Sequence, residues 1–482
     1  MKNLKKCIIK KIQYLNNLTF KLSLIIKKNF PIIIILFSSG IFSSFSLPPY
    51  NFFFINFFIF PLLFYILVNN LNKSIMFIFF IGFSYGFGYF LSNLYWISNS
   101  LKFDDNFENY VIISIFLLPF LLSLLYGLFS VSLKFFDIKF NFNSILFFSL
   151  SLSLIEFLRG TVFGGFPWNL ISFSIIKFTS SIQILNIIGT YSLNLLVITF
   201  YSLPIIILFK MSKLKKFIIL ISAIIILLVN ILYGLNRIEY IERKEKKTIS
   251  PPIKIVSPKF NIERFFVDEP IENKVNDLIK MSYPLNKDML LVFPEGMMNT
   301  VEINYLKNNS NQISDQLTDN SKIILGVNID KGKKIFNSMA LFNKEFKLES
   351  EYKKNKLVPF GEFLPFENFL SKVGIKKITG GYKSFSKSDE RNIMSINSYS
   401  FLPLICYEII FSGQLNKDSK NYDFILNISE DGWFGNSIGP VQHFSHSIFR
   451  SIEEGKDVLR VANNGISAHV SLNGNVNKKL GT

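Results

Sequence analysis

The chain has 482 residues, of which 49% are hydrophobic, and its formal net charge is +18. The apolar residues are concentrated in the first half, which is typical of a membrane protein and excludes a wholly soluble chain. Nucleic-acid binding, the other function that a basic chain suggests, is disfavoured because the lysines lie beside apolar segments, as juxtamembrane charges do.

The N-terminal segment 1–28 carries eight lysines and no acidic residue. A secretory signal also begins with basic residues, but here apolar segments recur over about two hundred further residues, and no Ala-x-Ala-like site closes the first of them. We therefore expect 1–28 to be a basic cytoplasmic N-terminus that leads into an uncleaved span.

The sequence predicts a transmembrane domain over residues 29–240 with about seven spans, since about 20 apolar residues cross a bilayer core. The spans are expected at 29–46, 51–68, 75–98, 110–133, 142–158, 183–209 and 216–235. With the N-terminus inside, the inner segments hold 15 lysines, whereas the outer loops hold only Lys102, Arg159 and Lys177. The positive-inside rule thus favours a cytoplasmic N-terminus, and seven spans place the following domain on the opposite side.

The loop between the fifth and sixth predicted spans, residues 156–168, contains three glycines and ends in Gly-Phe-Pro-Trp. This composition indicates an interfacial or re-entrant element. Trp168 is either an ordinary membrane-interface anchor or a residue that holds lipid chains, and both interpretations stay open. Glu156 and Arg159 stand at helical spacing near a span end, where they could form an ion pair.

A soluble domain is expected over residues 241–482, because charges become frequent and mixed after Arg237. Its predicted strands are the short apolar runs at 253–256, 289–293, 322–329, 338–342, 401–407, 424–428 and 458–461. Helical patterns fall between some of them, for example at 270–282 and 440–455. Strands and helices that alternate in this way predict one layered α/β domain.

The apolar run 401–411 is typical of a strand covered on both faces, with Cys406 and Glu408 near its end, where α/β proteins build sites. The expected topology puts the only other cysteine, Cys7, across the membrane, so Cys406 has no disulfide partner within the chain. A free thiol in this place is either a nucleophile or a small buried apolar residue.

A cysteine nucleophile needs a base, because a free thiol is mostly protonated at neutral pH. The histidines are His443, His446 and His469, of which the first two are three residues apart on a predicted helix and suit a structural role or a weak metal pair equally well. The other candidate base is Glu295, which follows a predicted strand and whose pKa burial would raise.

A lysine-rich segment at 352–365, which also contains Glu362, could favour a thiolate or stabilise the oxyanion of a tetrahedral intermediate. The sequence has no Cys-x-x-Cys pair and no glycine-rich phosphate-binding motif, so we expect neither a metal site nor a cofactor.

Three motifs together resemble the Glu, Lys and Cys motifs of the nitrilase superfamily of carbon–nitrogen hydrolases. They are Phe-Pro-Glu-Gly at 293–296, Tyr-Lys-Lys-Asn-Lys-Leu-Val-Pro-Phe-Gly-Glu at 352–362 and Ile-Cys-Tyr-Glu at 405–408. With 165–168, 427–443 and 459–465, the chain resembles more narrowly the apolipoprotein N-acyltransferase family of multi-span bacterial enzymes that complete lipoprotein maturation. The resemblance implies a multi-span α-helical membrane domain followed by an α/β nitrilase-like domain, an αββα sandwich.

The resemblance also implies roles for individual residues. Glu295 would be the general base, Lys354 would stabilise the oxyanion and Cys406 would be the nucleophile. The supporting residues would be Glu362, Tyr407 and Glu408, and the candidate lipid-binding residues are Trp168, Phe265, Phe266, Trp433 and Phe434.

The implied partners are a phospholipid acyl donor, typically phosphatidylethanolamine, diacylglyceryl-apolipoproteins as acceptors, and the lipid bilayer. The implied location is the bacterial inner membrane, with the catalytic domain on its periplasmic side. The alternatives are a membrane-tethered amidase or nitrilase, which would pass the acyl group to water, and a non-enzymatic membrane receptor or transporter subunit.

The chain departs from the family pattern in three places. Phe265 and Phe266 stand near the position where the family often has a tryptophan, and Glu430 and Gly432 replace the usual Asn and Ala. The sequence also ends at Thr482, before the expected last soluble segment and final span of the family.

Overall fold

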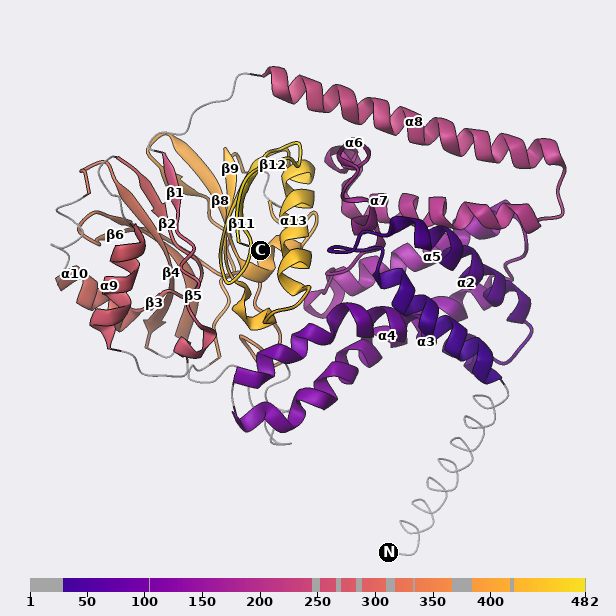
Figure 1. Ribbon diagram of the computed structural model, residues 1–482, viewed down its shortest axis with the longest axis horizontal. Helices are drawn as coiled ribbons and strands as arrows, with labels where there is room; N and C mark the ends of the chain where they lie inside the picture. Colours follow the sequence, from indigo (N-terminus) through magenta and orange to yellow (C-terminus); the bar gives the residue numbers. More distant parts are fainter. Residues whose placement is uncertain are drawn as a thin grey trace, which may run out of the picture.

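The computed structural model describes residues 29–481 apart from 104, 245–251, 266–269, 283–287, 309–316, 333, 366–383 and 417–419 (Figure 1). The predicted basic segment 1–28, with Cys7, and the candidate Phe266 lie outside the described residues.

Within the described residues, six helices are long and apolar enough to cross a membrane. They are Phe53–Asn70, which contains α2 (Asn56–Asn70); Ile75–Phe103, which begins with α3 (Ile75–Leu94); Phe107–Phe135, which ends with α4 (Val111–Phe135); α5 (Phe142–Thr161); Leu185–Leu208, which begins with α7 (Leu185–Ser202); and α8 (Lys213–Arg243). Each coincides with a predicted span. The first predicted span, 29–46, coincides with a shorter apolar helix, Asn29–Ser44.

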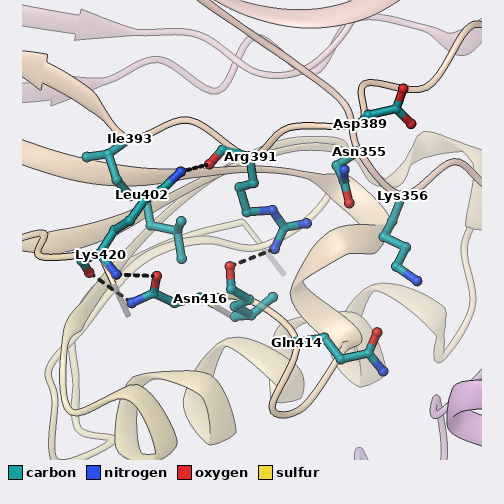
Figure 2. A pocket seen from close by; sticks show the side chains of 10 residues that line it. Asn355, Lys356, Asp389, Arg391, Ile393, Leu402, Gln414, Asn416 and Lys420 are labelled. Carbon is teal, nitrogen blue, oxygen red and sulfur yellow. Dashed lines mark hydrogen bonds between the residues drawn. The ribbon is translucent and has the colours of Figure 1, made fainter. Parts of the chain in front are cut away.

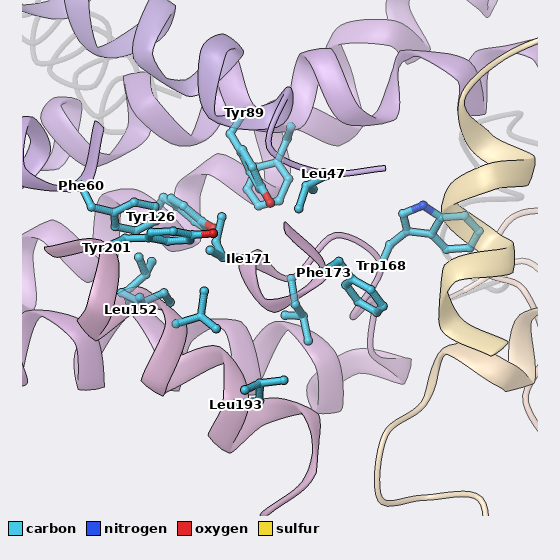
Figure 3. Packing of buried hydrophobic residues seen from close by; sticks show 14 of the residues in the cluster. Leu47, Phe60, Tyr89, Tyr126, Leu152, Trp168, Ile171, Phe173, Leu193 and Tyr201 are labelled. Carbon is cyan, nitrogen blue, oxygen red and sulfur yellow. The ribbon is translucent and has the colours of Figure 1, made fainter. Parts of the chain in front are cut away.

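The membrane helices approach one another closely where glycines lie at the contacts. A β-carbon added at Gly82 of α3 would lie 2.1 Å from the carbonyl oxygen of Tyr126 on α4. Small residues of this kind allow backbones to pack in a bilayer, where no hydrophobic force drives helices together. Figure 3 shows the aromatic core of the bundle, in which the rings of Phe60 and Tyr201 stack with centroids 5.9 Å apart.

The possible pair between Glu156 and Arg159 is confirmed, and it is fully buried near the end of α5. Tyr126 donates to Glu156 Oε1 at 2.5 Å, and Arg159 Nη1 donates to the carbonyl oxygen of Phe166 at 2.5 Å. Because a buried charge must be paired and hydrogen-bonded, these contacts fix the loop that follows α5. That loop carries the Gly-Phe-Pro-Trp motif.

The soluble domain contains two six-stranded sheets. The first has the order β1-β2-β4-β5-β6, and β3 pairs with β4: β1 (Ile253–Ile255), β2 (Leu290–Val292), β3 (Met298–Asn299), β4 (Lys322–Lys331), β5 (Lys334–Asn343) and β6 (Leu348–Lys353). The second has the order β12-β11-β10-β9-β8-β7: β7 (Met394–Ile396), β8 (Tyr399–Ile405), β9 (Phe424–Glu430), β10 (Asp457–Asn463), β11 (Ser467–Val470) and β12 (Val476–Leu480). In the first sheet the pairs β1–β2 and β2–β4 are parallel, and β4–β5 and β5–β6 are antiparallel. In the second sheet β8–β9 and β9–β10 are parallel, and β7–β8, β10–β11 and β11–β12 are antiparallel.

The two sheets pack face to face through one apolar core, which includes Val292 and Ile324 from the first sheet and Ile405 and Ile428 from the second. Helices α9 (Ile271–Ser282) and α10 (Thr300–Asn308) lie on the outer face of the first sheet, and α13 (Gly439–Glu454) covers the second (Figure 1). The expected αββα sandwich is therefore present. The strands that hydropathy did not predict include β6 and β12, which are polar edge strands.

The soluble domain packs on the membrane domain through α13, which contacts α7. Gln442 on α13 accepts a hydrogen bond from Trp168 Nε1 at 2.9 Å and donates to Asn93 at 3.2 Å. Glu453 accepts from the backbone N–H of Thr190 at 3.0 Å, directly after the break in α7 at Gly189. One apolar cluster runs without interruption from the membrane helices to the second sheet, so the two domains share a core.

Candidate active site

Several buried polar side chains meet where strands of the two sheets end. Glu295 follows β2, Lys354 follows β6, Cys406 follows β8 and Glu430 ends β9. All four side chains are less than one tenth exposed. The ends of strands in the two facing sheets thus bring together residues that are spread from position 295 to position 430 of the sequence.

The Lys354 ammonium lies between two carboxylates. It donates to Glu295 Oε1 at 3.1 Å and to Glu362 Oε1 at 3.0 Å. The amide of Asn337 on β5 donates to the same two oxygen atoms, at 2.7 Å each. Burial alone would lower the pKa of Lys354, but the charges of Glu295 and Glu362 outweigh it and hold that pKa well above its usual value. Lys354 is therefore a permanent cation.

The second oxygen of Glu295 is fixed from the other sheet, because the backbone N–H of Glu430 donates to Glu295 Oε2 at 2.9 Å. The backbone of Glu295 is fixed as well. A β-carbon at Gly326 on β4 would lie 2.3 Å from the carbonyl oxygen of Pro294 and 2.5 Å from Glu295 Cα, so no larger residue fits there. Glu295 therefore has little freedom to turn.

Cys406 stands in a sharp turn between β8 and the short 3-10 helix η9 (Cys406–Ile410), with φ at +48°. This left-handed conformation is costly for a residue with a side chain and persists only where the surroundings enforce it. Burial raises the pKa of the thiol, the charge of Glu295 raises it further, and the charge of Lys354 acts in the opposite direction. The thiol, Glu295 and Lys354 therefore share one electrostatic environment.

His443 contacts the backbone of Cys406. Its Nε2 lies 3.3 Å from the carbonyl oxygen of Cys406, and its Nδ1 lies 2.9 Å from Asp431. Arg460 donates to Asp431 at 2.8 Å, and all these side chains are fully buried. Burial and the charge of Arg460 lower the pKa of His443, whereas the charge of Asp431 acts in the opposite direction. Through its contact with the carbonyl oxygen of Cys406, the imidazole holds the turn. His446 instead contacts the carbonyl oxygen of Trp168, and His469 contacts Asp457.

Glu408 joins the lysine segment to the cysteine turn. Its Oε1 accepts from the backbone N–H groups of Asn355 and Lys356 at 2.9 and 3.1 Å, and its Oε2 accepts from Ile405 at 2.8 Å. Arg391 donates to the same carboxylate at 3.0 Å. Figure 2 shows Arg391 at a pocket on this side of the domain, where it also donates to the carbonyl oxygen of Leu415.

Tyr407 contacts the membrane domain. Its hydroxyl group donates to the carbonyl oxygen of Gly165 at 2.7 Å. Gly165 belongs to the loop that the buried Glu156–Arg159 pair fixes, so the cysteine turn and the Gly-Phe-Pro-Trp loop hold each other. Sequence patterns alone did not indicate this contact.

The aromatic candidates fall into two groups. Phe265 stacks on Trp433, with centroids 5.5 Å apart and planes 12° apart, and Phe265 also lies against Gly296, next to Glu295. Phe434 and Trp168 pack edge to face at 5.7 Å, and Trp168 is only 4% exposed. Trp168 is thus buried among protein side chains, and contact of any of these residues with lipid stays a prediction.

Sequence reasoning missed Asn337, Asp431, Arg391 and Arg460. Asn337 and Arg460 interrupt apolar strand runs with a polar side chain, and this is the signal that could have indicated buried polar positions. Among the described residues, no group of three or more His, Cys, Asp or Glu side chains is arranged to hold a metal ion.

Two family descriptions match separate parts of this chain. Residues 39–203 match the family described as Apolipoprotein N-acyltransferase N-terminal domain, and residues 290–482 match the family described as Carbon-nitrogen hydrolase. The first match covers most of the membrane helices, and the second begins at β2 and includes Glu295, Lys354 and Cys406.

Proteins named apolipoprotein N-acyltransferase are similar over most of their length. The one from Rickettsia typhi is 31% identical over 458 residues, which cover 93% of this chain and 89% of that protein. The one from Rickettsia prowazekii is 32% identical, with 83% and 80% covered. Among solved structures, Saccharomyces cerevisiae Nit3, a member of branch 10 of the nitrilase superfamily, is 16% identical and covers 48% of this chain and 85% of its own, with a TM-score of 0.34.

Replacing Asn337 by leucine tests the carboxylate cluster. Asn337→Leu removes both amide hydrogen bonds and leaves Oε1 of Glu295 and Oε1 of Glu362 bonded to Lys354 alone, so we expect unfolding to become easier by about 1–3 kcal/mol. Thermal unfolding of the detergent-solubilised chain measures this loss. Ser338→Ala is the matched control, since this neighbouring buried hydroxyl makes only a 3.4 Å contact. Equal unfolding temperatures for the two variants would contradict the assignment.

The raised pKa of Cys406 has a measurable consequence. Because the thiol stays protonated above neutral pH, we expect its alkylation by iodoacetamide to keep accelerating up to about pH 10, where a cysteine peptide with a pKa near about 8.5 has levelled off. Peptide mapping by mass spectrometry separates Cys406 from Cys7. If the alkylation rate of Cys406 levels off at or below the pH at which the rate of the cysteine peptide levels off, the prediction is wrong.

Proposed function

Because this chain belongs to the apolipoprotein N-acyltransferase family, we propose that it transfers an acyl chain from a phospholipid, through a thioester on Cys406, to an apolipoprotein. The acceptor is the α-amino group of the N-terminal diacylglyceryl-cysteine, and the reaction is the last step of lipoprotein maturation. The observation that carries the proposal is the buried Lys354 bonded to Glu295 and Glu362 in the environment of Cys406.

In the first half-reaction, Glu295 takes the proton of the Cys406 thiol as the sulfur attacks the ester carbonyl carbon of the phospholipid. The carbonyl oxygen becomes an oxyanion, which the permanent charge of Lys354 stabilises. When the ester C–O bond breaks, protonated Glu295 returns the proton to the departing lysophospholipid oxygen. Glu295 is suited to both transfers because Asn337 and the Glu430 N–H hold its oxygens in place.

In the second half-reaction, the α-amino group of the acceptor attacks the thioester carbonyl carbon. Glu295 assists by taking a proton from the amine, and Lys354 again stabilises the oxyanion. When the C–S bond breaks, protonated Glu295 returns the proton to the departing sulfur, an amide remains on the acceptor, and Cys406 is again a thiol ready for another cycle. Glu362 supports the site by holding Lys354 from the opposite side, and Glu408 fixes the turn that carries Cys406.

The membrane setting fits lipid substrates on both sides of the reaction. Tyr407, next to the nucleophile, bonds to Gly165 of the membrane domain, so the site is held close to that domain. The distribution of lysines supports an inner-membrane protein with a cytoplasmic N-terminus and a periplasmic catalytic domain. Phosphatidylethanolamine is the donor that we expect.

The test is a mass spectrum of the purified chain after incubation with phosphatidylethanolamine, with peptides mapped around Cys406. We expect a hydroxylamine-sensitive acyl adduct on Cys406 that disappears when a diacylglyceryl-cysteine peptide is added, as a ping-pong transfer requires. Lys354→Met should lower the rate of adduct formation by about 100-fold or more, the usual size for loss of an oxyanion donor.

Cys406→Ser is the control for the site of acylation. Release of free fatty acid in place of acylated peptide would favour a hydrolase of the amidase or nitrilase kind. A folded wild-type chain that forms no adduct and releases no fatty acid would contradict an acyl-transfer function and favour the non-enzymatic alternative.

A further inference from the structure

The buried residue Glu430 connects Glu295, the candidate general base, with the aromatic residues beside it. Glu430 is 1% exposed, and it accepts from Gly432 N at 2.9 Å, from Asn463 Nδ2 at 2.8 Å and from Arg264 Nη2 at 2.5 Å. Its own backbone N–H donates to Glu295 Oε2. One residue therefore contacts Glu295 through its main chain and Arg264 through its side chain.

Arg264 in turn contacts the ring of Phe265, the next residue in the chain. The guanidinium carbon lies 4.4 Å from the centroid of the Phe265 ring, a cation–π contact, and the same ring stacks on Trp433 at 5.5 Å. Trp433 also meets Phe103 at the end of the second long membrane helix, with centroids 6.0 Å apart. The aromatic wall, defined as Phe103, Phe265 and Trp433, thus runs from the membrane domain to Gly296 beside Glu295.

The ion pair holds the end of the segment that carries Phe265. Residues 257–265 lie between β1 and α9, where Ser257 donates to the carbonyl oxygen of Ala462, Phe260 is hydrogen-bonded to Asn463, and Ile262 is 2% exposed. Arg264 Nη2 reaches the end of β9 and pairs with Glu430, which holds the end of the segment against the second sheet. Removing either charge leaves the other buried without its partner, so the segment is expected to move.

We propose that the Arg264–Glu430 ion pair is a positioning device. It holds the aromatic wall next to Glu295, where the wall contacts the acyl chain of the donor. This inference rests on the proposed acyl transfer for its substrate, a long-chain acyl ester. Arg264 and Glu430 touch no reacting atom. They act through Phe265 and Trp433, so their loss should weaken the selection of long chains over short ones.

The experiment compares two thiol reagents that differ only in chain length, N-dodecylmaleimide and N-ethylmaleimide, on the full chain in one detergent. The readout is the ratio of the two alkylation rates at Cys406, mapped by mass spectrometry, which cancels differences in thiol reactivity between variants. We expect Glu430→Gln and Arg264→Gln each to lower the ratio by about tenfold, the size of change that a misplaced binding wall produces.

The double variant tests whether Arg264 and Glu430 act together as one pair or through two independent effects. If the two charges act as a pair, Arg264→Gln with Glu430→Gln should lower the ratio no more than either change alone, since coupled residues are not additive. Arg264→Lys, which keeps the charge, should recover part of the ratio. If the double variant lowers the ratio by the product of the two single effects, or if Arg264→Lys recovers none of the ratio, the two residues do not act as a pair.

The matched control is the ion pair between Lys274 and Glu302, which joins α9 to α10 at 2.9 Å on the outer face of the first sheet. Lys274→Gln and Glu302→Gln should keep the wild-type ratio. An unchanged ratio in the Arg264 and Glu430 variants, with unfolding temperatures that show folded protein, would overturn the proposal.

The same variants are then assayed for thioester formation with dipalmitoyl and dihexanoyl phosphatidylethanolamine. We expect the loss in kcat/KM to be larger for the long-chain donor by about tenfold. If the wild-type chain forms no thioester with either lipid, acyl transfer fails while the maleimide ratio still decides the role of the ion pair. The two claims are therefore tested separately.

Discussion

The buried ammonium group of Lys354 is the interaction on which the site depends. A cation without access to water is tolerated only when opposite charges and hydrogen bonds surround it, and here Glu295 and Glu362 supply both. The amide of Asn337 bonds to the same two oxygens, so the carboxylates cannot turn away without leaving several buried groups unpaired. Removing one partner of such a pair costs about 3–5 kcal/mol, and this cost fixes the geometry that the proposed acyl transfer needs.

The two sheets each supply groups to this site. Glu295 and Lys354 come from the first sheet, whereas Cys406 and Glu430 come from the second, and the apolar core between the sheets holds the two sets in register. His443 and Glu408 then fix the left-handed turn of Cys406 from two sides. Contacts from Tyr407 to Gly165 and from Gln442 to Trp168 extend the rigid assembly into the membrane domain.

The sequence indicated the architecture well, since long apolar segments and short buried strands both have strong patterns. Polar edge strands such as β12 escaped because their residues are exposed and carry no alternation. Glu295, Lys354 and Cys406 were found through motifs, and no pattern could show that Lys354 bonds to Glu295 and Glu362. Asn337 and Arg460 were missed because single polar residues in apolar strands gain meaning only when their partners from distant strands are known.

The chain-specific parts of the site were the hardest to interpret from sequence. Glu430 stood out only as a departure from the family pattern, and its pairing with Arg264 depends on two segments 166 positions apart. Burial raises the pKa of Glu430 to about 7, although the charge of Arg264 opposes this shift. Keeping this buried carboxylate ionised therefore costs free energy. The backbone N–H of the same residue donates to Glu295 Oε2, so Glu430 contacts the site directly.

The most direct measurement of the central claim is an experimental structure of the full chain trapped as the Cys406 acyl-enzyme in detergent or a lipid nanodisc. The account predicts that the thioester carbonyl oxygen lies within hydrogen-bonding distance, about 3 Å, of Lys354 Nζ, with Glu295 and Glu362 still bonded to the same ammonium. An acyl group on Cys406 whose carbonyl oxygen points away from Lys354, or a Lys354 that has left the two carboxylates, would contradict it.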